Sequence, residues 1–186
     1  MRTELKESLE KLVDFTNKAG ADGCDVILSK GESFSINAQN ADIDKYKVSG
    51  AQVIGVRAIK NSKVGLAYSE SLDDESLEFA AKAAVENAIN SEENLHEKIN
   101  VDSGEHIFPT EFKKDTSTTQ QKIDFCLKLE SEVKSRDSRV QAVPYNGLSE
   151  SESSSYYLNS NGVFGFDSEY YMSCYTSALL QEGSES

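Results

Sequence analysis

The feature that most constrains the fold is a series of short alternating segments, separated by brief polar turns, between residues 24 and 68. Apolar side chains occupy every second position in most of these segments, which is the pattern of strands with one buried face. Turns this short join antiparallel neighbours, because a parallel pair needs a long crossover. The expected strands are 24–29, 33–38, 43–48, 53–59 and 64–68, with turns at Lys30-Gly31-Glu32, 40–42, Ser49-Gly50 and Lys60-Asn61-Ser62.

Three helices are expected from apolar positions spaced 3.6 residues apart. The clearest has a stripe rich in alanine, which predicts close packing on a sheet. That stripe consists of Leu77, Ala80, Ala81, Ala84, Val85, Ala88 and Ile89. The helices are expected at 4–19, 72–90 and about 118–134. Their expected N-terminal caps are Thr3, Ser71 and a capping box of Ser117 with Gln120, and Gly20 is expected to end the first helix.

The same series of a helix followed by strands then recurs. Strand-like segments return at 139–144, 149–158, 163–166 and 170–180. Ser49-Gly50 corresponds to Asn161-Gly162 in this scheme. The order suggests an internal duplication of a helix-plus-four-strand unit, in an α/β protein of the α+β type. We expect one curved, mostly antiparallel sheet with three main helices. The two halves are about 1–90 and 117–183, joined by a long polar loop, 91–116.

Charge and hydropathy exclude several classes of partner. The chain has 32 acidic and 19 basic residues and a net charge of −13. A phosphate backbone repels such a surface, so no nucleic-acid partner is expected. No apolar run approaches the roughly 18 residues that span a membrane, so no membrane partner is expected. Residues 1–15 alternate charge with leucine, unlike a signal peptide, which indicates a cytoplasmic protein.

The residues that usually carry chemistry form no complete site. His96-Glu97 matches the start of a zinc-binding helix, but Asn100 and Val101 stand where a second histidine would be needed. His106 lies too far along, beyond Gly104. Cys24, Cys126 and Cys174 are widely spaced, with no Cys-x-x-Cys pair. We therefore expect no catalytic, metal-binding or cofactor-binding residue in this chain.

Two further segments have competing interpretations. The acidic segment 149–155, with Glu150 and Glu152, is expected to be an exposed strand or turn whose polar side chains face water. It could also be modified or hold a cation. The loop 91–116 is long for a compact domain, and such loops are usually functional or mobile.

Several segments resemble the N-terminal domain of the TldD/PmbA family, also called the modulator of DNA gyrase family. Their order and spacing carry the resemblance, which covers essentially all 186 residues. Residues 173–183 are most similar to the PmbA (TldE) branch. The other matching segments are Lys18-Ala19-Gly20-Ala21-Asp22 before a strand at 25–30, Gly55-Val56-Arg57, 65–69, the helix start at 71–77, and Leu158-Asn159-Ser160-Asn161-Gly162.

The resemblance implies that residues 1–186 are the N-terminal domain of a longer bacterial protein. This domain would be the non-catalytic part of a PmbA/TldE-like subunit, which pairs with a TldD-type metalloprotease in peptide maturation and proteolysis. Zinc is expected only in that partner, and the substrate of the complex is an unfolded or linear peptide. If the chain belonged to the TldD branch, catalysis would lie beyond residue 186. The alternative is a stand-alone binding or scaffold domain with no proteolytic role.

Overall fold

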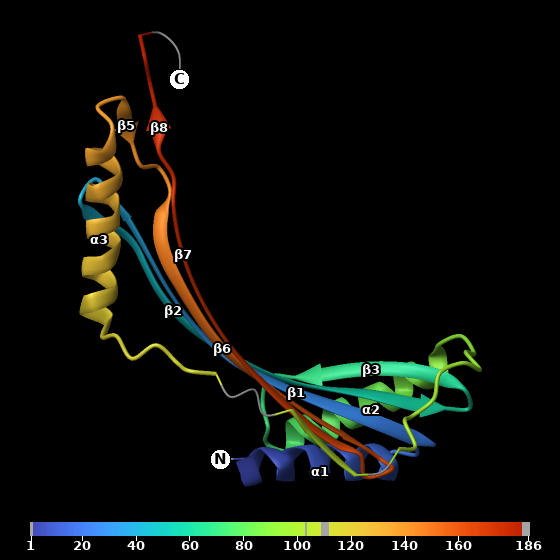
Figure 1. Ribbon diagram of the computed structural model, residues 1–186. Helices are drawn as coiled ribbons and strands as arrows, with labels where there is room; N and C mark the ends of the chain where they lie inside the picture. The colour runs from blue at the N-terminus through green and yellow to red at the C-terminus, as the bar shows by residue number, and fades with distance from the viewer. Residues whose placement is uncertain (1, 103, 109–111, 184–186) are drawn as a thin grey trace. The chain divides into compact units, whose positions relative to one another are not determined.

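The computed structural model describes residues 2–102, 104–108 and 112–183. It contains three helices and eight strands within these ranges (Figure 1). The mixed architecture with a mostly antiparallel sheet confirms the expected fold class. In chain order the elements are α1 (Arg2–Lys18), β1 (Gly23–Gln39), β2 (Asp42–Lys60), β3 (Lys63–Ser69), α2 (Asp74–Asn90), β4 (Glu105–Phe108), α3 (Thr119–Arg136), β5 (Val140–Ala142), β6 (Asn146–Asn159), β7 (Phe164–Thr176) and β8 (Leu179–Leu180).

Six strands form one sheet in the order β3-β2-β1-β6-β7-β4. The β2–β3 pair is antiparallel, and its register places Gly55 opposite Tyr68 and Arg57 opposite Leu66. The exception to antiparallel pairing is β4, which runs parallel to β7 and lies within the expected loop 91–116. Strands β5 and β8 make a separate two-stranded sheet.

The chain divides into two compact units that interleave along the sequence. Unit 1 comprises residues 1–31, 51–110 and 153–168, and unit 2 comprises 32–50, 111–152 and 169–186. Strands β1, β2, β6 and β7 each contribute residues to both units. These units therefore do not coincide with the sequential halves 1–90 and 117–183.

Two of the expected turns were wrong, because the chain continues through them as strand. Lys30-Gly31-Glu32 lies inside β1 and Ser49-Gly50 lies inside β2. Gly31 and Gly50 are each the last residue before the strand passes from one unit to the other. A glycine within a strand often marks a local irregularity rather than an end. The internal duplication is not confirmed, since its proposed correspondence matches Ser49-Gly50 inside a strand with Asn161-Gly162 in a turn.

The real turns contain residues in the left-handed region of backbone space. Asn40 and Ala41, between β1 and β2, have φ values of 57° and 60°. Asn61 and Ser62, between β2 and β3, have φ values of 51° and 59°. Two consecutive positive φ values define the tight hairpin turn that suits the twist of antiparallel strands. These turns join strands of 17, 19 and 7 residues.

The N-terminal capping residues of the helices differ from those expected from the sequence. Helix α1 begins at Arg2, so Thr3 lies within the helix, and Gly20, with a φ of 99°, ends it as expected. Asp73 rather than Ser71 caps α2. The capping box of α3 is formed by Thr118 and Gln121, one residue later than expected.

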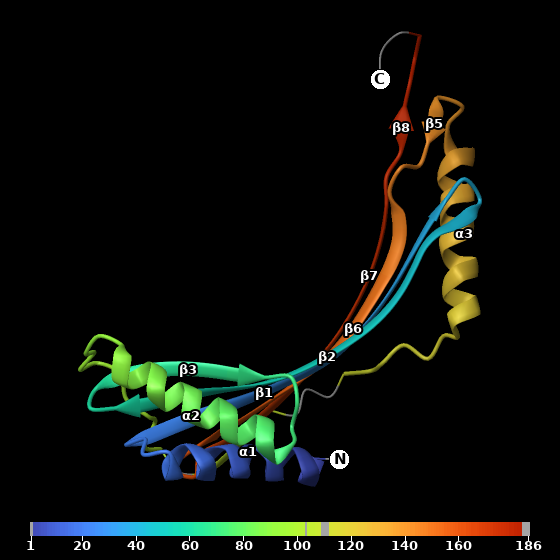
Figure 2. The ribbon, with the colours of Figure 1, turned by 180° about the vertical axis from the view of Figure 1, so that it is seen from behind.

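Unit 1 has a large apolar core between its strands and two helices. Figure 2 shows α2 lying across β3, with α1 beside it. The alanine stripe of α2 allows the helix to approach the sheet closely. A Cβ atom at Gly65 would lie only 2.0 Å from the carbonyl oxygen of Ala84, so only glycine fits there. The core cluster contains Leu9, Leu12, Cys24, Val26, Leu28, Ile54, Val56, Ala58, Leu77, Ala80, Ala81, Ala84, Val85, Tyr156, Leu158 and Phe166.

Unit 2 has a small apolar core beneath α3. The cluster contains four buried residues, Ile36, Ala38, Cys126 and Leu148. Three polar side chains are buried in the same unit, those of Lys122, Glu130 and Asn146. Asn146 donates hydrogen bonds from Nδ2 to the carbonyl oxygens of Cys126 (2.9 Å) and Ala38 (3.3 Å). The side chain therefore links α3, β1 and β6 within this unit.

Candidate functional site

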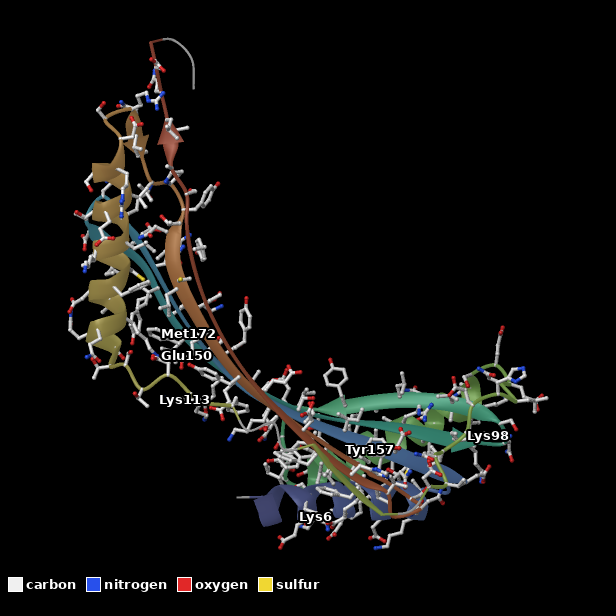
Figure 3. All side chains as sticks on the ribbon, in the orientation of Figure 1. Lys6, Lys98, Lys113, Glu150, Tyr157 and Met172 are labelled. Carbon is white, nitrogen blue, oxygen red and sulfur yellow. The ribbon has the colours of Figure 1, made fainter. Side chains whose placement is uncertain are left out.

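The helix-free face of the unit 1 sheet forms an open groove of about 700 Å³. Strand alternation explains it, because Cys24, Val26 and Leu28 point into the helix-covered core and the side chains between them point the other way. The same alternation on β2 and β6 brings Arg57 and Tyr157 to the groove, and Figure 3 shows Tyr157 on the strands of this unit. The lining residues are Asp25, Ile27, Gly55, Val56, Arg57, Leu66, Ala67, Tyr68 and Tyr157.

A charged network lies in this groove. Arg57 donates from Nε and Nη2 to the two carboxylate oxygens of Asp25, at 3.0 and 2.5 Å. Its Nη1 donates to Glu97 at 2.6 Å. These hydrogen bonds and charges, with Asp25 dominant, raise the pKa of Arg57 further above its ordinary value. The side chains of Arg57 and Asp25 are 30% and 11% exposed, so the bidentate pair is partly shielded from water.

The network also fixes the polar segment that follows α2. Glu97 belongs to this segment, and Asn100 in the same segment accepts hydrogen bonds at its carbonyl oxygen from Asn159 (2.9 Å) and Asn161 (2.8 Å). Burial raises the pKa of Tyr157, so its hydroxyl remains a neutral hydrogen-bonding group beside Asp25. The Arg57 guanidinium is occupied by these partners. The arrangement suits a rigid recognition surface better than proton transfer.

Unit 2 contains a second charged network where α3 meets β6 and β7. Lys122 forms ion pairs with Glu150 and Asp115 and lies 5.6 Å from the ring centre of Phe34. Burial alone would lower the pKa of Lys122, but its hydrogen bonds to Glu150 and Asp115 outweigh burial and raise it. Tyr170 donates from its hydroxyl to Glu150 at 2.7 Å. This network ties α3 and the segment before it to the sheet.

A groove of about 520 Å³ lies beside this network in unit 2. Figure 3 shows Glu150 and Met172 close to α3, on the strands that face the helix. Met172 and Phe125 are 37% and 44% exposed, so the groove has apolar walls open to solvent. Its lining residues are Ser117, Gln121, Lys122, Phe125, Leu148, Met172, Ser173 and Cys174.

Glu130 on α3 holds the β1–β2 hairpin turn of unit 2. Its two carboxylate oxygens accept hydrogen bonds from the backbone N–H groups of Asn40 (2.8 Å) and Ala41 (3.0 Å). Lys134 donates to the same carboxylate at 2.6 Å. Burial alone would raise the pKa of Glu130, but these hydrogen bonds outweigh it and lower the pKa below 4.5. The residue is 1% exposed and anchors the turn.

The histidines take no part in these networks. His96 is exposed, and the adjacent Glu97 is engaged by Arg57 instead of facing a second histidine. His106 lies on β4, opposite Gly165 of β7. Across the described residues, no group of three or more histidine, cysteine, aspartate or glutamate side chains is placed to hold a metal ion. None of the described helices has the length and apolar character needed to cross a membrane.

The three cysteines are free thiols among the described residues. Cys24 is buried in the unit 1 core, and burial raises its pKa to about 12. Cys126 is buried under α3, and burial raises its pKa as well. A nucleophilic cysteine needs a stabilised thiolate, which these environments oppose. Cys174 is exposed on β7.

The acidic segment 149–155 lies within β6, and the expectation that its polar side chains face water was wrong for Glu150. The side chain of Glu150 is 20% exposed and pairs with Lys122. Glu152, two residues along the same strand, pairs with Lys114. Both carboxylates are thus neutralised by lysines.

Sequence reasoning missed the paired charges of both units. A usable signal existed for unit 1, because Asp25 and Arg57 each interrupt an otherwise apolar strand, and a buried charge needs a partner. Asp25 and Arg57 lie 32 residues apart in the sequence, on the neighbouring strands β1 and β2. Only the sheet register brings them together.

The three helices and the mostly antiparallel sheet define an α+β protein. Residues 24–88 match the model of PmbA/TldA metallopeptidase domain 1, and residues 113–186 match that of the PmbA/TldA metallopeptidase central domain. Together these matches cover most of the chain. The chain belongs to the PmbA/TldD family.

Individual proteins resemble the chain in sequence or in fold. An uncharacterized protein of Methanocaldococcus jannaschii is 33% identical over 78 residues, which cover 42% of this chain and 18% of that protein. A putative modulator of DNA gyrase from Bacteroides thetaiotaomicron has a similar fold, with a TM-score of 0.82, 16% identity and coverage of 98% of this chain and 43% of that one. TldE from Thermococcus kodakarensis gives a TM-score of 0.74, 17% identity and coverage of 95% and 40%. The chain spans less than half the length of these solved structures.

Proposed function

We propose that this chain is the non-catalytic N-terminal module of a PmbA/TldE-like subunit, which pairs with a TldD-type metalloprotease. In that complex the metal-bearing subunit would hydrolyse unfolded or linear peptides, and this module would contribute subunit contacts. The observation that carries the proposal is the succession of two family domains, domain 1 and then the central domain, along the chain.

The chemistry of the chain supports a non-catalytic role. Metal-assisted hydrolysis needs a polarising cation with a base near the attacking water. The only His-Glu pair in the sequence is His96-Glu97, and Glu97 is held by Arg57 at 2.6 Å. That carboxylate therefore serves as an ion-pair partner. We propose that the partner subunit binds the zinc. We also propose that the complex is located in the cytoplasm.

The likeness to TldE supports the assignment to the PmbA/TldE branch at the level of the fold. The alternative is a stand-alone binding or scaffold domain without a proteolytic role. The two hypotheses differ in one measurable respect, since only the first requires a specific complex with a TldD-type subunit.

The test is co-purification followed by metal analysis. The chain is mixed with a TldD-type subunit from the same organism, and the mixture is separated by size-exclusion chromatography with light scattering. The proposal expects a complex of defined stoichiometry that contains zinc, while this chain alone retains no stoichiometric zinc after dialysis. Separate elution of the two proteins at micromolar concentration would favour the scaffold alternative.

A further inference from the structure

The helix-free face of unit 1 carries large apolar side chains that nothing in the described chain covers. Ile27, Leu66 and Tyr68 are 50%, 63% and 73% exposed, and all three line the same groove. We call Ile27, Leu66, Tyr68 and Tyr157 the apolar sheet face. Contiguous exposed apolar side chains on a sheet are typical of an interaction surface.

We propose that the apolar sheet face is the docking surface for a folded protein partner, which presents apolar side chains flanked by basic ones. This inference rests on the proposed function, because it identifies that partner with the TldD-type subunit. It adds the surface of this chain that the partner contacts and the chemistry of the partner's complementary surface.

The structure of the face resembles the centre of a protein interface. Two tyrosines and two aliphatic residues surround a partly shielded arginine, and tyrosine and arginine are enriched among residues that dominate binding energy. The bidentate bond to Asp25 holds the Arg57 side chain in place before a partner arrives. Gly55 lies opposite Tyr68 in the β2–β3 register, and a Cβ atom at Gly55 would approach only the carbonyl oxygen of Ala67, at 3.8 Å. A preformed surface of this kind binds with little loss of conformational entropy.

An extended peptide would fit this surface poorly. The backbone groups of the strands lie in the plane of the sheet, so a peptide on the face could not pair with them. Peptides add to a sheet at an edge strand. The two edge strands of this sheet are β3 and β4, and of these β3 contributes residues to the groove. The β3 edge is obstructed, because Asn87 donates from Nδ2 to the carbonyl oxygen of Leu66 at 2.9 Å, and the backbone of Glu93 forms an isolated antiparallel β-bridge with Lys63 at the start of β3. Without backbone pairing, the binding energy must come from contacts between side chains, and this favours a partner with a preformed surface.

A second copy of this chain is disfavoured by charge. The chain carries a net charge of −13. At the face itself, Asp25 and Glu97 flank the single Arg57, and Glu70 directly follows β3. Two copies docked through this face would place like charges against each other, which costs free energy. A partner with lysine or arginine around an apolar centre would instead be attracted.

The experiment measures the affinity of the TldD-type subunit for variants of this chain by isothermal titration calorimetry. In the first variant, Leu66→Lys and Tyr68→Lys are combined, and in the second, Leu66→Glu and Tyr68→Glu. We expect Kd to rise at least about tenfold for the lysine pair, because it removes two central side chains and adds repulsion. The glutamate pair should weaken binding less, because its charge is opposite to that of the partner's rim.

The matched control is Phe79→Lys. Phe79 lies on α2, away from the apolar sheet face, and is 75% exposed. The variant therefore removes an apolar side chain of similar exposure without changing the apolar sheet face. We expect Kd to change less than about twofold, since residues outside an interface contribute little to binding. Circular dichroism spectra are compared for all variants, and Leu66→Ser with Tyr68→Ser replaces any pair that fails to fold.

The possible results distinguish the pairing with a TldD-type subunit from the choice of docking surface on this chain. If the unmodified chain binds the TldD-type subunit and the lysine pair binds equally well, the docking surface is wrong and the pairing stands. If the unmodified chain does not bind, both the pairing and the docking surface are wrong. Sedimentation showing a homodimer that the lysine pair dissociates would overturn the inference in favour of a second copy.

Discussion

The two compact units are stabilised in different ways. Unit 1 has sixteen buried hydrophobic residues in one cluster, whereas unit 2 has four. Unit 2 instead buries Lys122 and Glu130, which hold α3 to the sheet and to the β1–β2 turn. Apolar burial stabilises a unit in proportion to area, whereas a buried ion pair adds little net stability but is costly to break. We therefore expect unit 1 to respond mainly to changes in packing and unit 2 mainly to changes in charge.

The largest effect is expected from Ala84→Asp in unit 1. Ala84 is fully buried, and its backbone approaches Gly65 of β3. An aspartate there would bury an unpaired carboxylate, so the free energy of unfolding should fall by more than about 3 kcal/mol. Urea denaturation provides the measurement, with the exposed Glu86→Asp on the same helix as control. An unchanged unfolding midpoint would show that the stripe does not form the core.

A somewhat smaller effect is expected from Glu130→Ala in unit 2. The substitution removes a buried carboxylate that accepts hydrogen bonds from the backbone N–H groups of Asn40 and Ala41, which should cost about 2–3 kcal/mol. The control is Glu132→Ala, whose carboxylate is 53% exposed and pairs with Lys128 on the surface. Equal losses for the two variants, measured by urea denaturation, would contradict the anchoring role of Glu130.

The pH dependence of stability should differ between the units. The pKa of Glu130 and that of Glu150 are both lowered in the folded state, because hydrogen bonds from lysines and neighbouring groups outweigh burial. A lowered pKa means that this stabilisation is fully present above the ordinary value of 4.5 and is lost as pH falls through the folded-state pKa.

Hydrogen exchange between pH 6 and pH 3 tests this difference. Amides of α3 and of the β1–β2 turn should lose protection before those of α2. In Glu130→Gln the loss in unit 2 should be shallower, because the side chain at position 130 no longer titrates. Uniform loss of protection in both units would show that the buried carboxylates do not determine the pH at which unit 2 unfolds.

The smallest effect is expected at the start of α3. Thr118 accepts a hydrogen bond from the backbone N–H of Gln121, and Thr118→Ala should cost about 1 kcal/mol. Ser117→Ala should cost less, because the Ser117 hydroxyl donates to Asp115 instead of capping the helix. If Ser117→Ala lowered the thermal unfolding midpoint more than Thr118→Ala, the capping box would lie at Ser117 and Gln120, as the sequence first suggested.

The apolar core of unit 1 was predictable because its signal is local. The stripe Leu77 to Ala88 has helical spacing, and the positions Cys24, Val26 and Leu28 alternate, so each pattern is visible within one element. Ile89 was included in the stripe but is 54% exposed at the end of α2. The prediction of three helices was correct for the same reason.

The long strands and the polar contacts were not predictable from local patterns. Glycine and serine suggested turns at Gly31 and Gly50, but pairing along the sheet overrides turn propensity there. Glu130 and the Asn40 amide are separated by 90 residues, and a periodic pattern carries no information on such a contact. The resemblance to a family supplied the functional hypothesis that the candidate site could not.

The most direct test of the functional account is peptide hydrolysis by this chain with and without a TldD-type subunit. Unfolded peptides are incubated with added zinc, and cleavage is followed by mass spectrometry. The account predicts no cleavage by this chain alone, because Glu97 is paired with Arg57 and the sequence has Asn100 and Val101 where a second metal-binding histidine would be needed. It predicts cleavage when the metal-bearing subunit is present. Cleavage by this chain alone that His96→Ala abolishes would contradict the account.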